Sequence, residues 1–133
     1  MAEAVTGVSP FARAWMHVGV VQVGGEKMAK SAGNLVLVGD VVESYPPPVL
    51  RLLLIDRPWA RPWDFEPDAL DRAAARLERL YAAAARGPDG SSSATGAVTT
   101  ALSANLDVPA ALAVAETDGG AAARLALSVL GLS

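Results

Sequence analysis

The most regular pattern of apolar residues in the sequence runs from residue 67 to about residue 85. Its apolar members recur at spacings of three and four: Leu70, Ala73, Ala74, Leu77, Leu80, Tyr81 and Ala84. This spacing predicts one amphipathic helix with a single apolar stripe. Pro67 suits the first turn of such a helix, and Gly87-Pro88 ends it. Asp68 and Arg72, four residues apart, form a favourable pair on its polar face.

Two shorter apolar runs predict extended structure. Residues 15–23 (WMHVGVVQV) are rich in β-branched and aromatic side chains, which favour strands, and Gly24-Gly25 ends the run. Residues 34–38 (NLVLV) form a second run that we also expect to be extended. Between the two runs lies a polar loop, GGEKMAKSAG, with glycines at both ends.

Proline and capping residues predict three further short elements. Residues 1–5 are typical of the tail of a helix. Asp40 can accept hydrogen bonds from free N–H groups of a first turn, so we expect it to cap a short helix that runs through Tyr45. Pro48 suits the first turn of another helix, over residues 49–54. Residues 56–66 contain two prolines and two tryptophans, and we interpret them as an ordered loop that packs its indoles on the core.

The remaining sequence predicts a linker followed by helices. Residues 86–96 (RGPDGSSSATG) have the composition of a flexible linker. Beyond it we expect two or three short Ala- and Leu-rich helices, broken at Asp107-Val108-Pro109 and at Gly119-Gly120. The fold class is therefore α/β at first and then mostly α. Its parts are residues 1–55 with the glycine-bounded loop, residues 56–85, the linker 86–96 and a short helical bundle over 97–133.

Composition narrows the possible chemistry. The chain has 133 residues, no cysteine and one histidine, which excludes disulfides, thiolate metal sites and a zinc site made by histidines alone. A net charge of −3 gives no electrostatic basis for wholesale nucleic-acid binding. No apolar run reaches the roughly 20 residues that span a membrane. The first residues have no features of an export signal. We therefore expect a cytoplasmic protein without a membrane partner.

The two lysines of the chain, Lys27 and Lys30, both lie in the polar loop, whereas the other nine cations are arginines. A compact ammonium suits phosphate oxygens as a point charge. When a carboxylic acid is adenylated, pyrophosphate leaves and negative charge builds on it, so mobile ammonium groups stabilise the transition state. We expect Gly24, Gly25 and Gly33 to let the loop swing. The alternative is a chance pair on a solvated turn.

The loop and its neighbours resemble a known family. Glu26-Lys27-Met28-Ala29-Lys30-Ser31, followed by Gly33-Asn34, is similar to the second ATP signature of class I aminoacyl-tRNA synthetases, Lys-Met-Ser-Lys-Ser. Three other segments are similar to the cysteinyl branch of that family: residues 11–19, residues 49–52 and residues 105–112. Residues 34–38 and 128–132 look more like the mycothiol cysteine ligases of that branch than the cysteinyl-tRNA synthetases.

The resemblance implies a function and a set of site residues. Residues 1–55 would be the end of a class I catalytic domain, and residues 56–85 a loop and helix like the stem-contact region. Lys30 would be the catalytic lysine and Lys27 its partner, with ATP contacts from Lys27, Met28, Lys30, Ser31 and His17. The substrates would be ATP with Mg²⁺, cysteine, and an acceptor, either glucosaminyl-inositol or tRNA(Cys). Ala29 replaces the usual first serine of the signature, and we expect attenuation at most.

The sequence lacks three features that the family places before the loop: the His-x-Gly-His signature, the nucleotide-binding half and the zinc site. We therefore expect activity only with an N-terminal catalytic half supplied in trans, and little ATP affinity from this chain alone. Two alternatives are a non-catalytic remnant that acts as a helical interaction module, and a truncated gene model whose true start lies upstream.

Several residues have two interpretations. Ser31 either donates to a phosphate or caps a following turn. His17 lies either near an active site or in a structural role in a strand. Arg51 either braces the loop or lies on a helix surface, and the surface is the simpler reading. We expect all three tryptophans, Trp15, Trp59 and Trp63, to be core residues.

Overall fold

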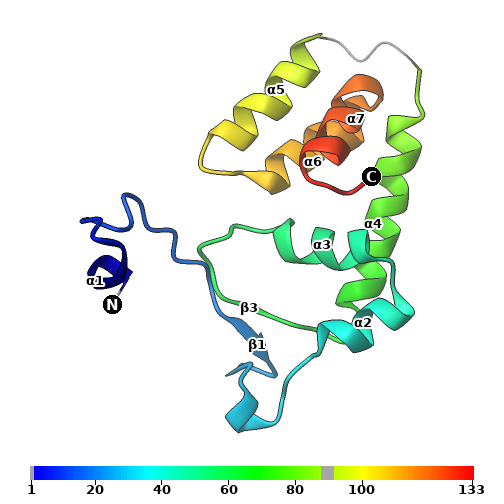
Figure 1. Cartoon of the computed structure of the whole chain (residues 1–133). Coiled ribbons are helices and arrows are strands. Elements are labelled where there is room, and N and C mark those ends of the chain that lie inside the picture. Colours follow the sequence, from blue (N-terminus) through cyan, green and yellow to red (C-terminus); the bar gives the residue numbers. More distant parts are fainter. Residues whose placement is uncertain (1, 88–91) are drawn as a thin grey trace.

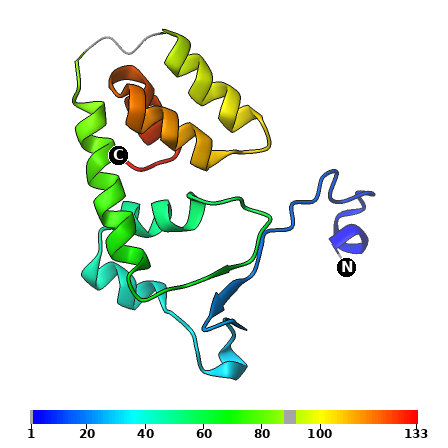
Figure 2. The same ribbon diagram turned by 180° about the vertical axis from the view of Figure 1, so that it is seen from behind.

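The computed structural model describes residues 2–87 and 92–133. A small sheet lies at one end of the molecule and a helical bundle at the other, and the longest helix, α4, runs beside both (Figures 1 and 2). The elements in chain order are α1 (Ala2–Thr6), β1 (Val21–Val23), β2 (Glu26–Lys27), the 3-10 turn η1 (Lys30–Ala32), α2 (Val38–Ser44), α3 (Pro47–Ile55), β3 (Trp63–Asp64), α4 (Ala69–Ala84), α5 (Ser92–Ser103), α6 (Val108–Asp118) and α7 (Gly120–Val129). This order confirms the expected fold class, a small α/β part followed by a mostly helical part.

The sheet has three strands in the order β2-β1-β3. β1 pairs antiparallel with β2, with Gln22 opposite Lys27, and parallel with β3, with Gln22 opposite Asp64. The strand expected over residues 15–23 is therefore confirmed only for its last three residues. Residues 15–18 are exposed and belong to no strand, because a strand requires a hydrogen-bonded neighbour and β-branched composition does not supply one. β3 lies within the segment 56–66, which we had expected to be a loop throughout.

The expected cap of α2 is wrong. The helix begins at Val38, after Leu37 in an extended conformation, and its N-cap has no side-chain hydrogen bond. Asp40 therefore lies inside the first turn, where its charge favours the helix dipole but caps nothing. The run over residues 34–38 forms no strand, and its last residue belongs to α2. By contrast, α3 is helical over Pro47–Ile55 with proline in its first turn, as predicted.

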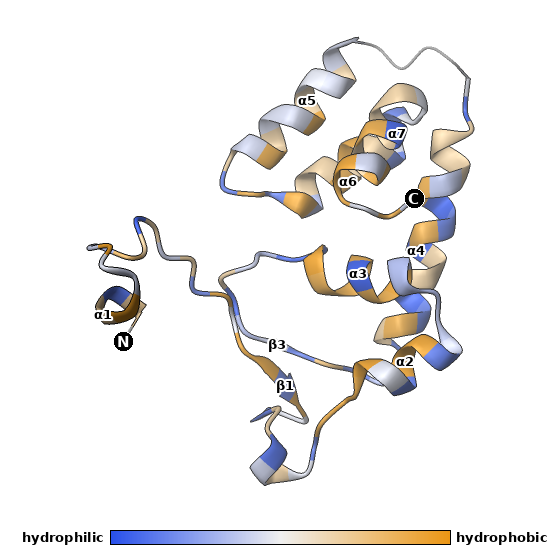
Figure 3. Ribbon diagram, in the orientation of Figure 1, coloured by the Kyte–Doolittle hydropathy of each residue, from blue (hydrophilic) through white to orange (hydrophobic). Residues whose placement is uncertain are grey.

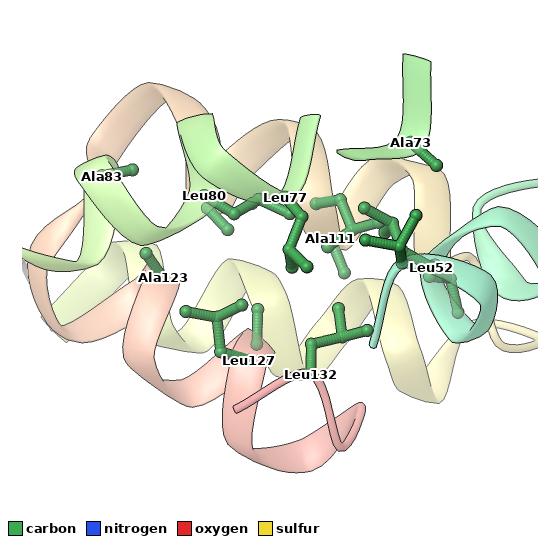
Figure 4. Packing of buried hydrophobic residues seen from close by; sticks show 14 of the residues in the cluster. Leu52, Ala73, Leu77, Leu80, Ala83, Ala111, Ala123, Leu127 and Leu132 are labelled. Atoms are coloured by element: carbon green, nitrogen blue, oxygen red, sulfur yellow. The ribbon is translucent and has the colours of Figure 1, made fainter. Parts of the chain in front are cut away.

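Helix α4 confirms the prediction from periodicity and organises the core. Its stripe contributes Leu70, Ala73, Leu77 and Leu80, which are all buried. Figure 4 shows Leu77 and Leu80 facing the same interior as Leu52 of α3 and Leu127 of α7. The pair Arg72–Asp68 is also present, on the exposed face. The core is thus shared between α3, α4 and the bundle.

The bundle consists of α5, α6 and α7, which pack on one another, with α6 and α7 also packed on α4. Its helix breaks fall where proline and glycine predict them. The carboxylate of Asp107 accepts a hydrogen bond from the N–H of Ala110 at the start of α6. The last turn is tied down because the Tyr81 hydroxyl donates to the carbonyl of Leu132, at 2.7 Å. The linker was expected over residues 86–96, but residues 92–96 are helical and belong to α5. Residues 88–91 lie outside the described residues.

Charged side chains join the first half of the chain to the bundle. Arg76 of α4 pairs with Asp56 at the end of α3 and with Glu116 of α6. Arg57 lies over the ring of Trp63, 3.5 Å from its centroid. Burial lowers the pKa of Arg57, and the charge of Asp56 opposes this effect.

No helix in the described part of the chain is both long and apolar enough to cross a membrane.

The tryptophans differ from the expectation of three core residues. Trp59 and Trp63 are half-buried, but Trp15 is 78% exposed. The indole N–H of Trp59 donates to the carbonyl of Asn105, which joins the segment after α3 to the α5–α6 turn. Trp15 belongs to the extended segment that leads from α1 to β1, and the ring of His17 stacks beside it. Its position in sequence gives no sign of this exposure.

Candidate functional site

The lysine loop, residues 24–34, begins as a tight hairpin. Gly24 and Gly25 join β1 to β2 with φ angles of 62° and 80°, a two-residue turn whose positive φ angles favour glycine. After β2 the chain returns to the sheet, because the N–H of Met28 donates to the carbonyl of Val21. The 3-10 turn η1 follows and ends at Gly33 in the left-handed conformation. The loop is therefore folded back on itself through its own backbone.

Asn34 closes the base of the loop. Its side-chain oxygen accepts from the N–H of Ala29 at 2.9 Å, and its amide nitrogen donates to the carbonyl of Lys27 at 3.3 Å. One carboxamide thus holds the backbone on both sides of Met28. Sequence reasoning included Asn34 only as a flank of the signature and gave it no role.

Asp64 of β3 holds the other end of the loop. One carboxylate oxygen accepts from the N–H of Gly24 at 2.9 Å, and the other accepts from the N–H of Gly25 at 2.5 Å. Sequence reasoning missed this residue, which lies about forty positions from the turn. Only the parallel pairing of β3 with β1 brings them together.

Met28 anchors the middle of the loop. Its half-buried side chain lines a small apolar pocket of about 100 Å³ between the sheet, α2 and α3. The pocket walls come from apolar side chains of several elements, among them Val41, Leu50, Leu53 and Phe65. Met28 thus lies on the body of the protein and not on the outer face of the loop.

Lys27 and Lys30 are both exposed. Among the described residues neither ammonium group has an ion-pair partner, although seven of the arginine and acidic side chains do pair with one another. Lys27 lies in β2 and Lys30 begins η1, so Asn34 holds the backbone between them. Two free ammonium groups on a held backbone are suited to binding an anion with several oxygens, such as a polyphosphate.

The other candidate residues are placed as follows. Ser31 lies inside η1, whose N-cap is Ala29, so the capping interpretation does not hold. His17 is exposed and stacks on Trp15, with ring centroids 6.2 Å apart. Nothing in the described residues joins His17 to the lysine loop. Arg51 does not brace the loop, because its guanidinium lies beside Gly131 near the C-terminus.

Comparison with known proteins adds the family to this geometry. The family described as tRNA synthetases class I (C) catalytic domain matches residues 1–75, which include the lysine loop and β3. The chain belongs to this class I synthetase family. The match covers more than half of this synthetase-family chain and ends within α4. The bundle lies beyond it.

Individual relatives of the synthetase-family chain are cysteine ligases of two kinds. The L-cysteine:1D-myo-inositol 2-amino-2-deoxy-alpha-D-glucopyranoside ligase of Thermobispora bispora is 45% identical over 82% of this chain and 27% of the relative. The corresponding ligase of Streptomyces griseus is 44% identical over 86% and 29%. The cysteine–tRNA ligase of Pseudomonas syringae pv. tomato is 37% identical over 93% and 30%. The chain thus spans less than a third of the length of these relatives.

Proposed function

We propose that this chain supplies the phosphate-contacting loop and the following helical region of an ATP-dependent ligase that activates cysteine. Lys30 stabilises the pyrophosphate leaving group, and Lys27 assists it at the triphosphate. The observation that carries the proposal is the lysine loop itself. Two unpaired ammonium groups project from a backbone that Asn34 and Asp64 hold, and this loop lies in the segment that matches the synthetase catalytic domain.

The chemistry follows from the charge that the loop would meet. A carboxylate oxygen of cysteine attacks the α-phosphorus of ATP, and the bond from that phosphorus to the bridging oxygen of the pyrophosphate breaks. Negative charge builds on the departing pyrophosphate, so cations placed beside it stabilise the transition state more than the bound substrate. Ser31 belongs to the same contact surface in this proposal, and Met28 contributes to it only through its backbone, because its side chain lines the apolar pocket. His17 would join this surface only if the segment before β1 folds towards the nucleotide.

The acceptor in this proposal is an amine of the glucosaminyl-inositol kind. Two cysteine–glucosaminyl-inositol ligases align with more than four-fifths of the chain. The net charge of −3 also favours a small acceptor over a polyanion. A cysteine–tRNA ligase aligns over an even larger share of the chain, so tRNA is the alternative acceptor.

Magnesium would arrive with the nucleotide, held by its phosphate oxygens. In the described part of the chain no three histidine or acidic side chains gather as metal ligands. The lysines suit the phosphate oxygens of such a complex.

The distribution of exposed apolar side chains supports a need for further protein. Large exposed hydrophobic residues concentrate before α4, with Trp15, Val18 and Val38 among the most exposed at 78%, 68% and 63%. Figure 3 shows hydrophobic segments in this region, at β1 and leading into α2, outside the bundle. The remainder of a catalytic domain, supplied in cis or in trans, would cover such a surface.

The same surface favours a second candidate function, a non-catalytic interaction module. The sequence favoured docking through the helical bundle. The exposed apolar residues instead favour the segment before α4 as the docking face of such a module. Within the described bundle only Leu106 and Val129 are large exposed hydrophobic residues.

The two functions are separated by complementation. The full chain is mixed with, or fused to, the part of the Thermobispora bispora relative that precedes its matching region, and cysteine-dependent ATP–pyrophosphate exchange is measured. We expect exchange only when both parts are present. Lys30→Ala should lower its rate on the order of 10²- to 10³-fold, as expected for loss of a charge that acts in the transition state.

Arg61→Ala is the matched control, since it removes an exposed cation that lies outside the lysine loop, and it should leave the rate unchanged. A fused or co-eluting complex without any exchange would refute the ligase function and leave the interaction module. Equal rates for Lys30→Ala and Arg61→Ala would refute the role of the loop.

A further inference from the structure

We propose that Asp64 is a positioning residue for the lysine loop: its carboxylate fixes the Gly24-Gly25 turn and thereby sets where Lys27 and Lys30 lie. The hold on the loop is a property of this chain. Only its consequence for cysteine activation rests on the proposed function.

Asp64 is itself held firmly at the backbone. The residue before it donates its N–H to the carbonyl of Val20 at 3.1 Å, and the residue after it donates to the carbonyl of Gln22 at 2.7 Å. The side chain of Asp64 therefore starts from a fixed point on the sheet. Its two oxygens reach the two successive N–H groups of the turn, at 2.9 and 2.5 Å.

The turn cannot act as a free hinge while these bonds exist. Glycines at positions 24 and 25 permit the φ angles that the hairpin needs, and from sequence we expected them to let the loop swing. The structure shows a different arrangement, because the N–H groups of both glycines are bonded to one carboxylate. Charge-assisted bonds of this kind are about twice as strong as neutral ones. Flexible residues are thus held in one conformation by a side chain from another strand.

The position of the turn determines the position of Lys27 first and of Lys30 after it, because both lysines follow the turn along the chain. β2 follows the turn directly and contains Lys27, which lies opposite Gln22 in the pairing. Asn34 then holds the N–H of Ala29, next to Lys30. Asp64 therefore positions the first arm of the loop, and Asn34 positions its base. Loss of Asp64 should free the first arm and leave the base in place.

The surroundings of Asp64 allow this role to be separated from folding. The glycine N–H groups are exposed, so water can replace the carboxylate if it is removed. We therefore expect Asp64→Ala to leave the melting temperature within a few degrees while it releases the turn. Glu66→Ala is the matched control, because Glu66 is a nearby exposed acid that pairs with Arg72 and does not touch the loop.

The first measurement needs no enzymatic activity. Backbone order parameters of residues 24–30 are determined by NMR in the full chain, together with amide exchange of Gly24 and Gly25. Rigid backbone gives values of about 0.85 and flexible backbone values below about 0.6. We expect Asp64→Ala to move the turn and Lys27 to the flexible range and to speed exchange of both glycine amides, and Glu66→Ala to change neither. Asp64→Asn keeps one acceptor oxygen and should give intermediate values.

The second measurement uses the complemented ligase. Because the lysines act in the transition state, Asp64→Ala should lower kcat about tenfold with little change in the KM for cysteine, and Asp64→Asn should restore part of the loss. If Asp64 had a merely structural role, both variants would lose kcat in proportion to the fall in their melting temperatures.

Unchanged order parameters in a folded Asp64→Ala protein would overturn the proposal. So would Asp64→Ala and Glu66→Ala variants that lose order equally. If Asp64→Ala fails to fold, Asp64→Asn decides the matter by the same comparison. A wild-type complex without exchange, together with a released turn in Asp64→Ala, would refute the ligase function and support the hold of Asp64 on the loop.

Discussion

The region before α4 and the region from α4 onwards use their apolar residues in opposite ways. Of the buried apolar residues in the described chain, all but four lie in α4 or later, the exceptions being Val41, Val49, Leu52 and Leu53. The large exposed hydrophobic residues show the reverse distribution. The second region thus contains most of the core, to which the first region adds four residues, and the first region presents apolar side chains and two free ammonium groups. Most of the buried packing lies in one region and the candidate chemistry in the other.

The largest expected effect is on the free energy of unfolding, when a buried leucine of the second region and a half-exposed leucine of the first are each replaced by alanine. Leu112 of α6 is fully buried, so Leu112→Ala should lower the free energy of unfolding by about 3 kcal/mol through lost burial and a residual cavity. Leu54 of α3 is 50% exposed, and Leu54→Ala should cost less than about 1 kcal/mol. Urea denaturation of the full chain measures both. Similar losses would mean that the region before α4 shares the core more fully than its exposure indicates.

The helices were predictable where the sequence shows a one-sided apolar stripe or a strong break. α4 has its stripe at regular spacing, and Gly119-Gly120 and Pro109 divide the bundle as expected. β3 was not predictable, because two residues become a strand only through a partner about forty positions away. Trp15 was expected in the core, yet composition cannot tell which surface a tryptophan covers.

The candidate site was predictable in part for the same reasons. Lys27 and Lys30 could be assigned to one glycine-bounded segment because the glycines and the signature are local, but Lys27 lies in β2 and the second expected strand, over residues 34–38, does not form. The roles of these lysines stay predictions. Asp64 belongs to no local motif, and its contact with the loop depends on the register of β3 with β1. Residues that hold a loop from another strand are the part of the site that a sequence pattern does not contain.

The next effect compares one aspartate from each region. Asp107 caps α6, so Asp107→Ala should cost about 1 kcal/mol of unfolding free energy. Asp40 caps nothing in α2, and Asp40→Ala should stay within about 0.3 kcal/mol of zero, because the lost dipole interaction is offset by the helix propensity of alanine. Thermal melts of the two variants side by side measure the difference. An equal cost for Asp40→Ala would restore the cap that we expected from the sequence.

The smallest effect is at the boundary between the regions, where the hydroxyl of Tyr45, after α2, donates to a carboxylate oxygen of Asp71 in α4 at 2.6 Å. This hydrogen bond raises the pKa of Tyr45 above its ordinary value of 10.0, and burial and the charge of Asp71 act in the same direction. Because the folded pKa is the higher one, the stabilisation is complete below about pH 10, the unfolded pKa, and is lost as pH rises through the folded value. An alkaline titration of tyrosinate absorbance, taken as the difference between wild type and Tyr45→Phe, should show Tyr45 ionising late, and Asp71→Asn should move it back towards its ordinary value. An unshifted Tyr45 would mean that this bond does not persist in solution, and that the two regions are joined by the ion pairs of Arg76 and by their shared core.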